Sequence, residues 1–213
     1  MVMDPRKRQK KLERHKAKQN AQRHELARRD SRSLSFRLER AAAAPILHCC
    51  TTAEIWQQGM GHVLISRQLD NGNVAFALLL LDIYCLGVKD VMMDVAPRVR
   101  YDRDLFGRLA RQRRLTQLRP ECARKLVEGA VRYALDLGLP PHDDYRTAKL
   151  IFGDIPAEAC SEEYVFGKDG KPHFIAGPYD SSDRCEHIIR TLQNACGPGG
   201  YHFLVPCGDL PPI

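Results

Sequence analysis

The sequence predicts an α+β protein: a single domain with a mixed or antiparallel sheet, built on two hairpins, packed by helices and preceded by a basic helical or disordered N-terminal arm. Three observations lead to this class. A long apolar run follows an Asn-Gly turn, a helical pattern begins at Pro120, and the regular alternation of strands and helices that predicts a doubly wound sheet is missing.

Charge divides the chain into an arm, residues 1–40, and a globular domain, residues 41–213. The arm has 14 basic and 5 acidic residues, a net charge of +9, whereas the domain has 19 basic and 21 acidic residues, a net charge of −2. Helix-forming residues dominate the arm, but apolar residues are sparse before Leu34. We therefore expect the arm to be disordered or transiently helical, and to become ordered on a polyanion.

A block of positive charge of this kind is typical of nucleic-acid contact through phosphate neutralisation and counterion release. The alternative is a solvated tail, or an arm that docks on an acidic protein. Aromatic residues are absent before Phe36, so base stacking is not expected in the arm. The residues expected to contact phosphates are Arg6, Lys7, Arg8, Lys10, Lys11, Arg14, Lys16 and Lys18 in the arm, with Arg111, Arg113 and Arg114 of the domain extending the footprint.

The clearest element is a hairpin that begins near residue 61. Its first strand alternates around Val63 and Ile65, and Asn71-Gly72 is a strong turn signal because both residues tolerate positive φ. The second strand, Val74 to about Tyr84, is apolar on both faces, as expected of a central strand covered on two sides. Trp56, which lies just before the hairpin, is expected to be a core anchor.

Helices dominate the second half of the chain. Pro120 suits the first turn of a helix that ends before Gly138, where Pro140-Pro141 prevents continuation. The remaining expected elements are a helix capped by Asp143 and stopped by Gly153, a hairpin that turns at Asp169-Gly170, a helix capped by Ser181 or Ser182, and a short last strand within residues 201–207.

Two segments, LLDIYCLGVKD (80–90) and YALDLGLPPHDDYRTAKLIFGDI (133–155), resemble a set of uncharacterised bacterial proteins. In those proteins a hairpin that ends in D-x-x-C-L-G-V-K precedes a helix and an L-G-x-x-P-H-x-D-Y segment. The resemblance covers roughly residues 59–205 and excludes the basic arm. It implies no activity, so no catalytic role is carried over from it.

Asp82 is the most informative polar residue of the domain, because a carboxylate in an apolar run is costly to bury unless it is paired or hydrogen-bonded. One hypothesis is a metal-dependent nuclease or phosphohydrolase, with Asp82, Lys89 and Asp90 as catalytic residues and Mg²⁺ as cofactor. The usual Asp/Glu-x-Lys spacing is absent, since Gly87 stands two residues before Lys89. The alternative, which we favour, is a structural aspartate near a strand end that binds backbone amides or an arginine.

Other catalytic and metal motifs receive less support. Cys85 could act as a nucleophile with a histidine, but no partner is identifiable, and His142-Asp143-Asp144 is better explained by helix capping than by a metal site. The C-terminal cysteines and histidines fit no common zinc spacing, and phosphate-binding loops are absent. We therefore expect no cofactor and no structural zinc.

The eight cysteines are expected to be reduced thiols, because the charged N-terminal residues show no apolar secretory segment. No apolar run approaches the roughly 18 to 20 residues that span a bilayer, so we expect a cytoplasmic protein without membrane contact.

The favoured function is a nucleic-acid-binding or ribonucleoprotein-associated accessory protein, more a binder than an enzyme, with a possible protein partner on the domain. Two alternatives stay open. One is the nuclease centred on Asp82, and the other is a protein-interaction module that does not bind nucleic acid.

Overall fold

The structure, a computed structural model, describes residues 33–205 and confirms the α+β class. Its centre is a five-stranded sheet in which every pairing is antiparallel and the strand order is β4-β3-β2-β1-β5. The strands are β1 (Ile46–Thr52), β2 (Met60–Gln68), β3 (Asn73–Asp82), β4 (Gly87–Pro97) and β5 (Leu115–Gln117).

The Asn71-Gly72 hairpin is confirmed. It joins β2 to β3, and Gly72 adopts a φ of 78°, which a residue with a side chain rarely takes. β3 lies between β2 and β4, and its alternate residues serve two different cores. Ala77 and Leu79 belong to the core on one face of the sheet, whereas Phe76 and Leu78 belong to the core on the other.

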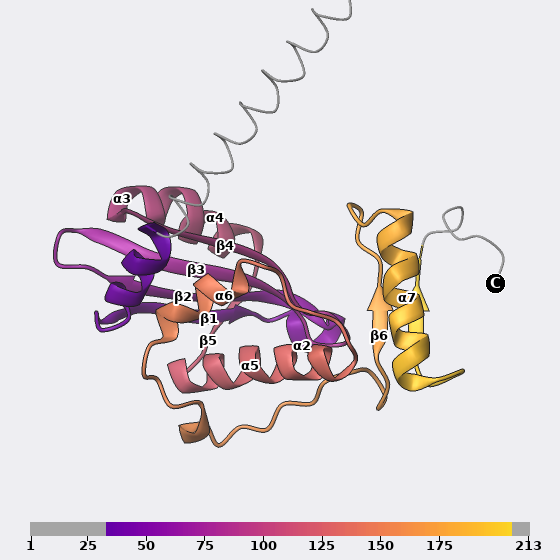
Figure 1. Ribbon diagram of the computed structural model, residues 1–213. Helices are drawn as coiled ribbons and strands as arrows, with labels where there is room; N and C mark the ends of the chain where they lie inside the picture. The colour runs from indigo at the N-terminus through magenta and orange to yellow at the C-terminus, as the bar shows by residue number, and fades with distance from the viewer. Residues whose placement is uncertain (1–32, 206–213) are drawn as a thin grey trace, which may run out of the picture.

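Two helical layers cover the sheet, with α3 (Arg98–Arg100) and α4 (Gly107–Gln112) on one face and α5 (Pro120–Asp136) on the other (Figure 1). The predicted helix from Pro120 is confirmed, and it buries Leu126 and Ala130 against the sheet. On the opposite face, the π-helical turn η1 (Tyr101–Phe106) links α3 to α4 and buries Tyr101. A sheet with both faces covered explains why β3 is apolar from Val74 to Leu81.

The globular body begins earlier than residue 41. Residues 33–41 are helical, and Leu38 and Ala41 are buried in the same core as α5. The apolar residues of this helix, Leu34 among them, therefore belong to the packed body.

The C-terminal part of the body stands at one end of the sheet (Figure 1). The predicted last helix is confirmed as α7 (Ser182–Cys196), where Ser181 Oγ caps the first turn by accepting a hydrogen bond from the Arg184 amide. Phe174, Ile188 and Leu192 form a core there with Cys85, from the turn between β3 and β4. Ala134, near the end of α5, belongs to the same core.

The expected hairpin at Asp169-Gly170 is wrong. These residues do form a tight turn that closes a bridge between Lys168 and Lys171. The strand that follows, β6 (His173–Ile175), pairs in parallel with β7 (His202–Leu204). Parallel strands need a crossover connection, and α7 provides it. The second hairpin of the fold is instead the β3–β4 connection, where Asp82 pairs with Gly87.

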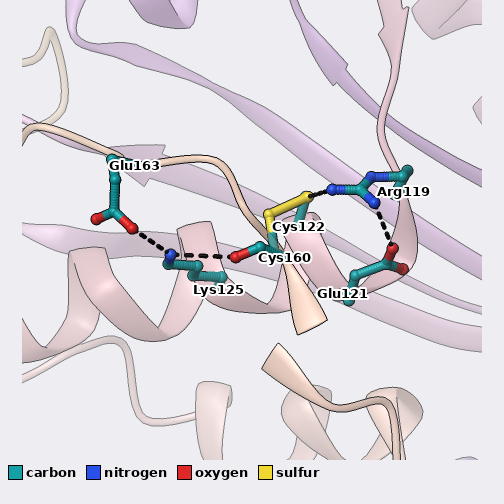
Figure 2. Close-up of a disulfide and its surroundings, with 6 residues drawn as sticks. All are labelled: Arg119, Glu121, Cys122, Lys125, Cys160 and Glu163. Carbon is teal, nitrogen blue, oxygen red and sulfur yellow. Dashed lines mark hydrogen bonds and ion pairs between the residues drawn. A yellow bond between two sulfur atoms is a disulfide. The ribbon is translucent and has the colours of Figure 1, made fainter. Parts of the chain in front are cut away.

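The expectation of reduced thiols is wrong for one pair of cysteines. Cys122, in the first turn of α5, forms a disulfide with Cys160, 38 residues later (Figure 2). Lys125 donates a hydrogen bond to the Cys160 carbonyl and pairs with Glu163, so the loop is held beside α5 at several points. The other cysteines within residues 33–205, which form no disulfide, are Cys49, Cys50, Cys85, Cys185 and Cys196.

Trp56 is not a core anchor. It follows Ile55 in the short helix α2 (Ile55–Gln58), and it is Ile55 that is buried. The Trp56 side chain is 44% exposed and stacks on Tyr164, with ring centroids 5.6 Å apart. None of the helices within residues 33–205 has both the length and the apolar character required to span a bilayer.

Candidate nucleic-acid interface and the Asp82 turn

Asp82 organises the turn between β3 and β4. It is the last residue of β3 and is 3% exposed. Its Oδ1 atom accepts hydrogen bonds from the backbone amides of Tyr84, at 2.9 Å, and Cys85, at 3.0 Å. The carboxylate therefore satisfies two donors of a tight turn, which is a structural task of the kind that aspartate commonly performs in turns.

The electrostatic state of Asp82 follows from its burial. Burial raises the pKa of Asp82 to about 6, against the opposing effect of the backbone amides and of Lys89. Its Oδ2 atom is buried, and within residues 33–205 it has no hydrogen-bond partner. With 3% of its surface exposed, the side chain cannot contact a metal ion or substrate without movement of the turn.

Lys89 and Asp90 make their contacts with residues other than Asp82. The β3–β4 register shifts between the pairs Leu80–Asp90 and Leu81–Val88, so Lys89 is the extra residue of a β-bulge. Lys89 Nζ lies 2.7 Å from Asp180 Oδ2, whereas Asp90 is exposed and accepts a hydrogen bond from the Val91 amide.

The Asp82 turn is thus not a cluster of carboxylates. Within residues 33–205, no group of three or more histidine, cysteine or acidic side chains is placed so that it could hold a metal ion. Asp82, Lys89 and Asp90 are neighbours in the sequence, but their side chains are engaged separately.

The second candidate is a basic surface on the helical layer that α3, η1 and α4 form. We define the arginine ridge as the seven arginines of residues 98–114, which share this segment with only two acidic residues and give it a net charge of +5. Its members are Arg98, Arg100, Arg103, Arg108, Arg111, Arg113 and Arg114. All except Arg98 are exposed, because buried residues such as Tyr101 and Leu109 hold the segment on the sheet from below.

Most of the ridge is free of ion pairs. Arg98 pairs with Asp102 and Arg103 with Asp104, each at 2.6 Å. No ion pair within residues 33–205 involves Arg111, Arg113 or Arg114, the three arginines identified from the sequence, and the same holds for Arg100 and Arg108. Exposed guanidinium groups without carboxylate partners are available to phosphates.

The helix that opens the body, which packs on the α5 side of the sheet and not on the side of the ridge, carries a separate basic pocket with an aromatic side chain. Phe36 is 59% exposed, and the Arg40 guanidinium lies 5.7 Å from its ring centroid. Both residues line a pocket of about 590 Å³ together with Arg37. The arm residues Arg6 to Lys18 lie outside the described residues, so the structure does not place them.

A hydrogen-bonded relay beneath the ridge was missed at the sequence level. The Tyr101 hydroxyl donates to Ser66 Oγ at 2.9 Å, and it lies 2.9 Å from His48 Nδ1. Because the Tyr101 proton goes to Ser66, the hydroxyl oxygen accepts from His48, which places the imidazole proton on Nδ1 and leaves Nε2 as an acceptor. Burial, together with the charge of Arg98, lowers the pKa of His48.

Three separate elements supply this relay. His48 lies on β1, Ser66 on β2 and Tyr101 in η1, and the last of these is 53 residues from His48. No local spacing links such residues.

The chain matches no protein-family model, and the searches of curated proteins and of solved structures return no significant match.

Proposed function

We propose that this chain is a nucleic-acid-binding or ribonucleoprotein-associated accessory protein of the cytoplasm, whose basic arm and arginine ridge contact phosphates. The observation that carries the proposal is the arginine ridge, an exposed segment of net charge +5 on a body whose total charge is slightly negative. Positive charge that is concentrated on one segment, instead of being spread over the surface, is typical of a protein that binds a polyanion.

The proposed contacts position a strand without selecting its sequence. Arginine and lysine side chains on phosphates carry no base information, and each neutralised phosphate releases counterions. The eight arm residues from Arg6 to Lys18 and the ridge residues Arg111, Arg113 and Arg114 would act together, so affinity should fall steeply with salt.

The test is the salt dependence of binding to single-stranded and duplex RNA and DNA. Three proteins are compared with the full chain: a deletion of residues 1–32, a ridge variant with Arg111→Gln, Arg113→Gln and Arg114→Gln, and a matched control with Arg132→Gln, Arg146→Gln and Arg190→Gln. The control arginines are exposed but lie outside the ridge.

We expect the deletion and the ridge variant to bind more weakly, with a salt slope reduced by about 0.7 per lost contact on single strands and about 0.9 on B-DNA. The control, which loses the same charge, should change far less. The proposal fails if neither the deletion nor the ridge variant changes affinity or slope. If the full chain binds as expected, a higher affinity for RNA or for DNA identifies the preferred nucleic acid.

A protein partner on the body belongs to the same proposal. The exposed Trp56–Tyr164 stack and Val165, which is 81% exposed, supply apolar surface of the type found at protein interfaces. A body that captures a protein partner while no polyanion binds at low salt would favour the protein-interaction alternative. For the nuclease alternative, cleavage that needs Mg²⁺ and is lost in a folded Asp82→Asn variant would be the supporting result.

A further inference from the structure

Beside the arginine ridge lies a pocket whose chemistry differs from that of the ridge. Its volume is about 410 Å³, within the range of small-molecule sites. Phe106, Leu115 and Leu118 give it apolar walls, and His48 and Gln117 are its main hydrogen-bonding side chains. Among the described residues that line it, no side chain is an acid, a lysine or an arginine. The pocket therefore suits an uncharged, largely apolar group with a hydrogen-bonding edge.

His48 is held in one orientation at this pocket. Phe106 stacks on its ring with the centroids 3.8 Å apart and the planes 5° from parallel. Ser66 and Tyr101, which are 0% and 1% exposed, fix its Nδ1 edge from below. His48 lines the pocket, and its Nε2 atom is a lone-pair acceptor in the tautomer that the relay imposes. A ligand group with an N–H donor satisfies that atom.

The pocket and the ridge share one segment of chain. Phe106 and Leu115 line the pocket, and between them in the sequence stand Arg108, Arg111, Arg113 and Arg114. A strand whose phosphates lie on those arginines would carry its bases past the pocket. A nucleobase is planar, uncharged and bears N–H donors, which matches the walls, the absence of charge and the His48 acceptor.

We infer that this pocket receives a nucleobase of the strand that the ridge holds, with Phe106 as an apolar wall, His48 Nε2 as acceptor and the Gln117 amide as a second polar contact. This inference rests on the proposed function and adds a base-dependent component to a binding mode that otherwise involves only phosphates.

The experiment compares a single-stranded 12-nucleotide oligomer with an abasic oligomer that has the same number of phosphates, at the same salt concentration. The full chain should bind the base-bearing oligomer about five-fold or more tightly than the abasic one, the size expected of one stacked base. The variants His48→Gln and Gln117→Leu should weaken binding of the base-bearing oligomer and so reduce that ratio toward one. Gln112→Leu, an exposed glutamine of α4 that does not line the pocket, is the matched control and should keep the ratio.

The outcomes separate the two proposals. Equal binding of the two oligomers by the full chain overturns the nucleobase pocket and leaves the phosphate contacts intact. A ratio that survives in both His48→Gln and Gln117→Leu also overturns it, because the bases then bind elsewhere. Absence of salt-dependent binding to either oligomer overturns the proposed function itself. Gln117 is exposed on β5, so its variant remains informative if the His48 variant fails to fold.

Discussion

At the scale of single residues, a polar side chain in an apolar run can have either a structural role or a role in binding, and the structure gives a candidate for each. Asp82 is enclosed and directs one oxygen to the amides of Tyr84 and Cys85. His48 is only half-buried and lines a pocket, although a buried relay fixes its ring. Burial that ends in backbone donors indicates a structural task, whereas an oriented side chain that lines a pocket is a candidate for ligand binding.

The burial of Asp82 leads to a pH prediction. Because burial raises its pKa from 3.8 to about 6, the folded protein holds this proton more tightly than the unfolded chain. The resulting stability is fully present below about pH 4 and is lost as the pH rises through about 6. Asp82→Asn removes this dependence, so between pH 4 and pH 7 the free energy of unfolding should shift in favour of the variant by roughly 2 to 3 kcal/mol.

Urea denaturation of both proteins at several pH values measures that shift. Other groups, such as Asp180, whose pKa is lowered by Lys89 and the Gly177 amide against the opposing effect of burial, titrate in both proteins and cancel in the comparison. Parallel pH profiles for the parent and Asp82→Asn would show that the carboxylate is not desolvated as the fold requires.

At the scale of elements, sequence reasoning worked where the signal is local. The Asn71-Gly72 turn, the helix that begins at Pro120 and the helix capped by Ser181 each depend on residues a few positions apart, and each is confirmed. The parallel pairing of β6 with β7 depends on His173 meeting His202 across an intervening helix, which no turn signal encodes. The Asp169-Gly170 turn is real, but a turn does not determine which strand the next segment pairs with.

The disulfide between α5 and the following loop is another long-range feature, and it gives a stability prediction. Cross-linking residues 38 apart stabilises the fold by about 4 kcal/mol in the loop-entropy model. A reductant should therefore lower the midpoint of denaturation of the parent and leave a Cys122→Ser, Cys160→Ser variant unchanged. The control Cys196→Ser, which removes a free thiol, should keep the sensitivity of the parent to reductant.

A parent protein whose unfolding is the same with and without reductant would contradict this prediction. The same bond bears on the proposed compartment, because cytosolic reductants keep most thiols reduced. Alkylation of free thiols at the moment of cell lysis would show how much of the chain carries the bond in cells, and a fully formed bond would count against a cytoplasmic location.

At the scale of the whole molecule, composition concealed the arrangement of charge. A domain charge of −2 gave no reason to expect a basic surface, yet seven arginines fall on one segment and many acidic residues lie in the loops after α5. The sequence identified Arg111, Arg113 and Arg114 as a cluster. Their placement on one exposed ridge could not be predicted, because it depends on the burial of Tyr101 and Leu109 against the far face of the sheet.

Two basic surfaces on one molecule predict bivalent binding. If the arm and the ridge hold the same strand, the second contact forms at a high effective concentration, and a long strand gains affinity that a short one cannot. The full chain should therefore bind a 30-nucleotide oligomer far more tightly than an 8-nucleotide one, beyond the increase due to the number of available sites. Deletion of residues 1–32 should by itself abolish this length advantage, and so should the triple substitution of Arg111, Arg113 and Arg114. Competition titrations with both oligomers measure it, and losses that are equal for the two lengths would mean that the arm and the ridge bind independently, as two separate surfaces.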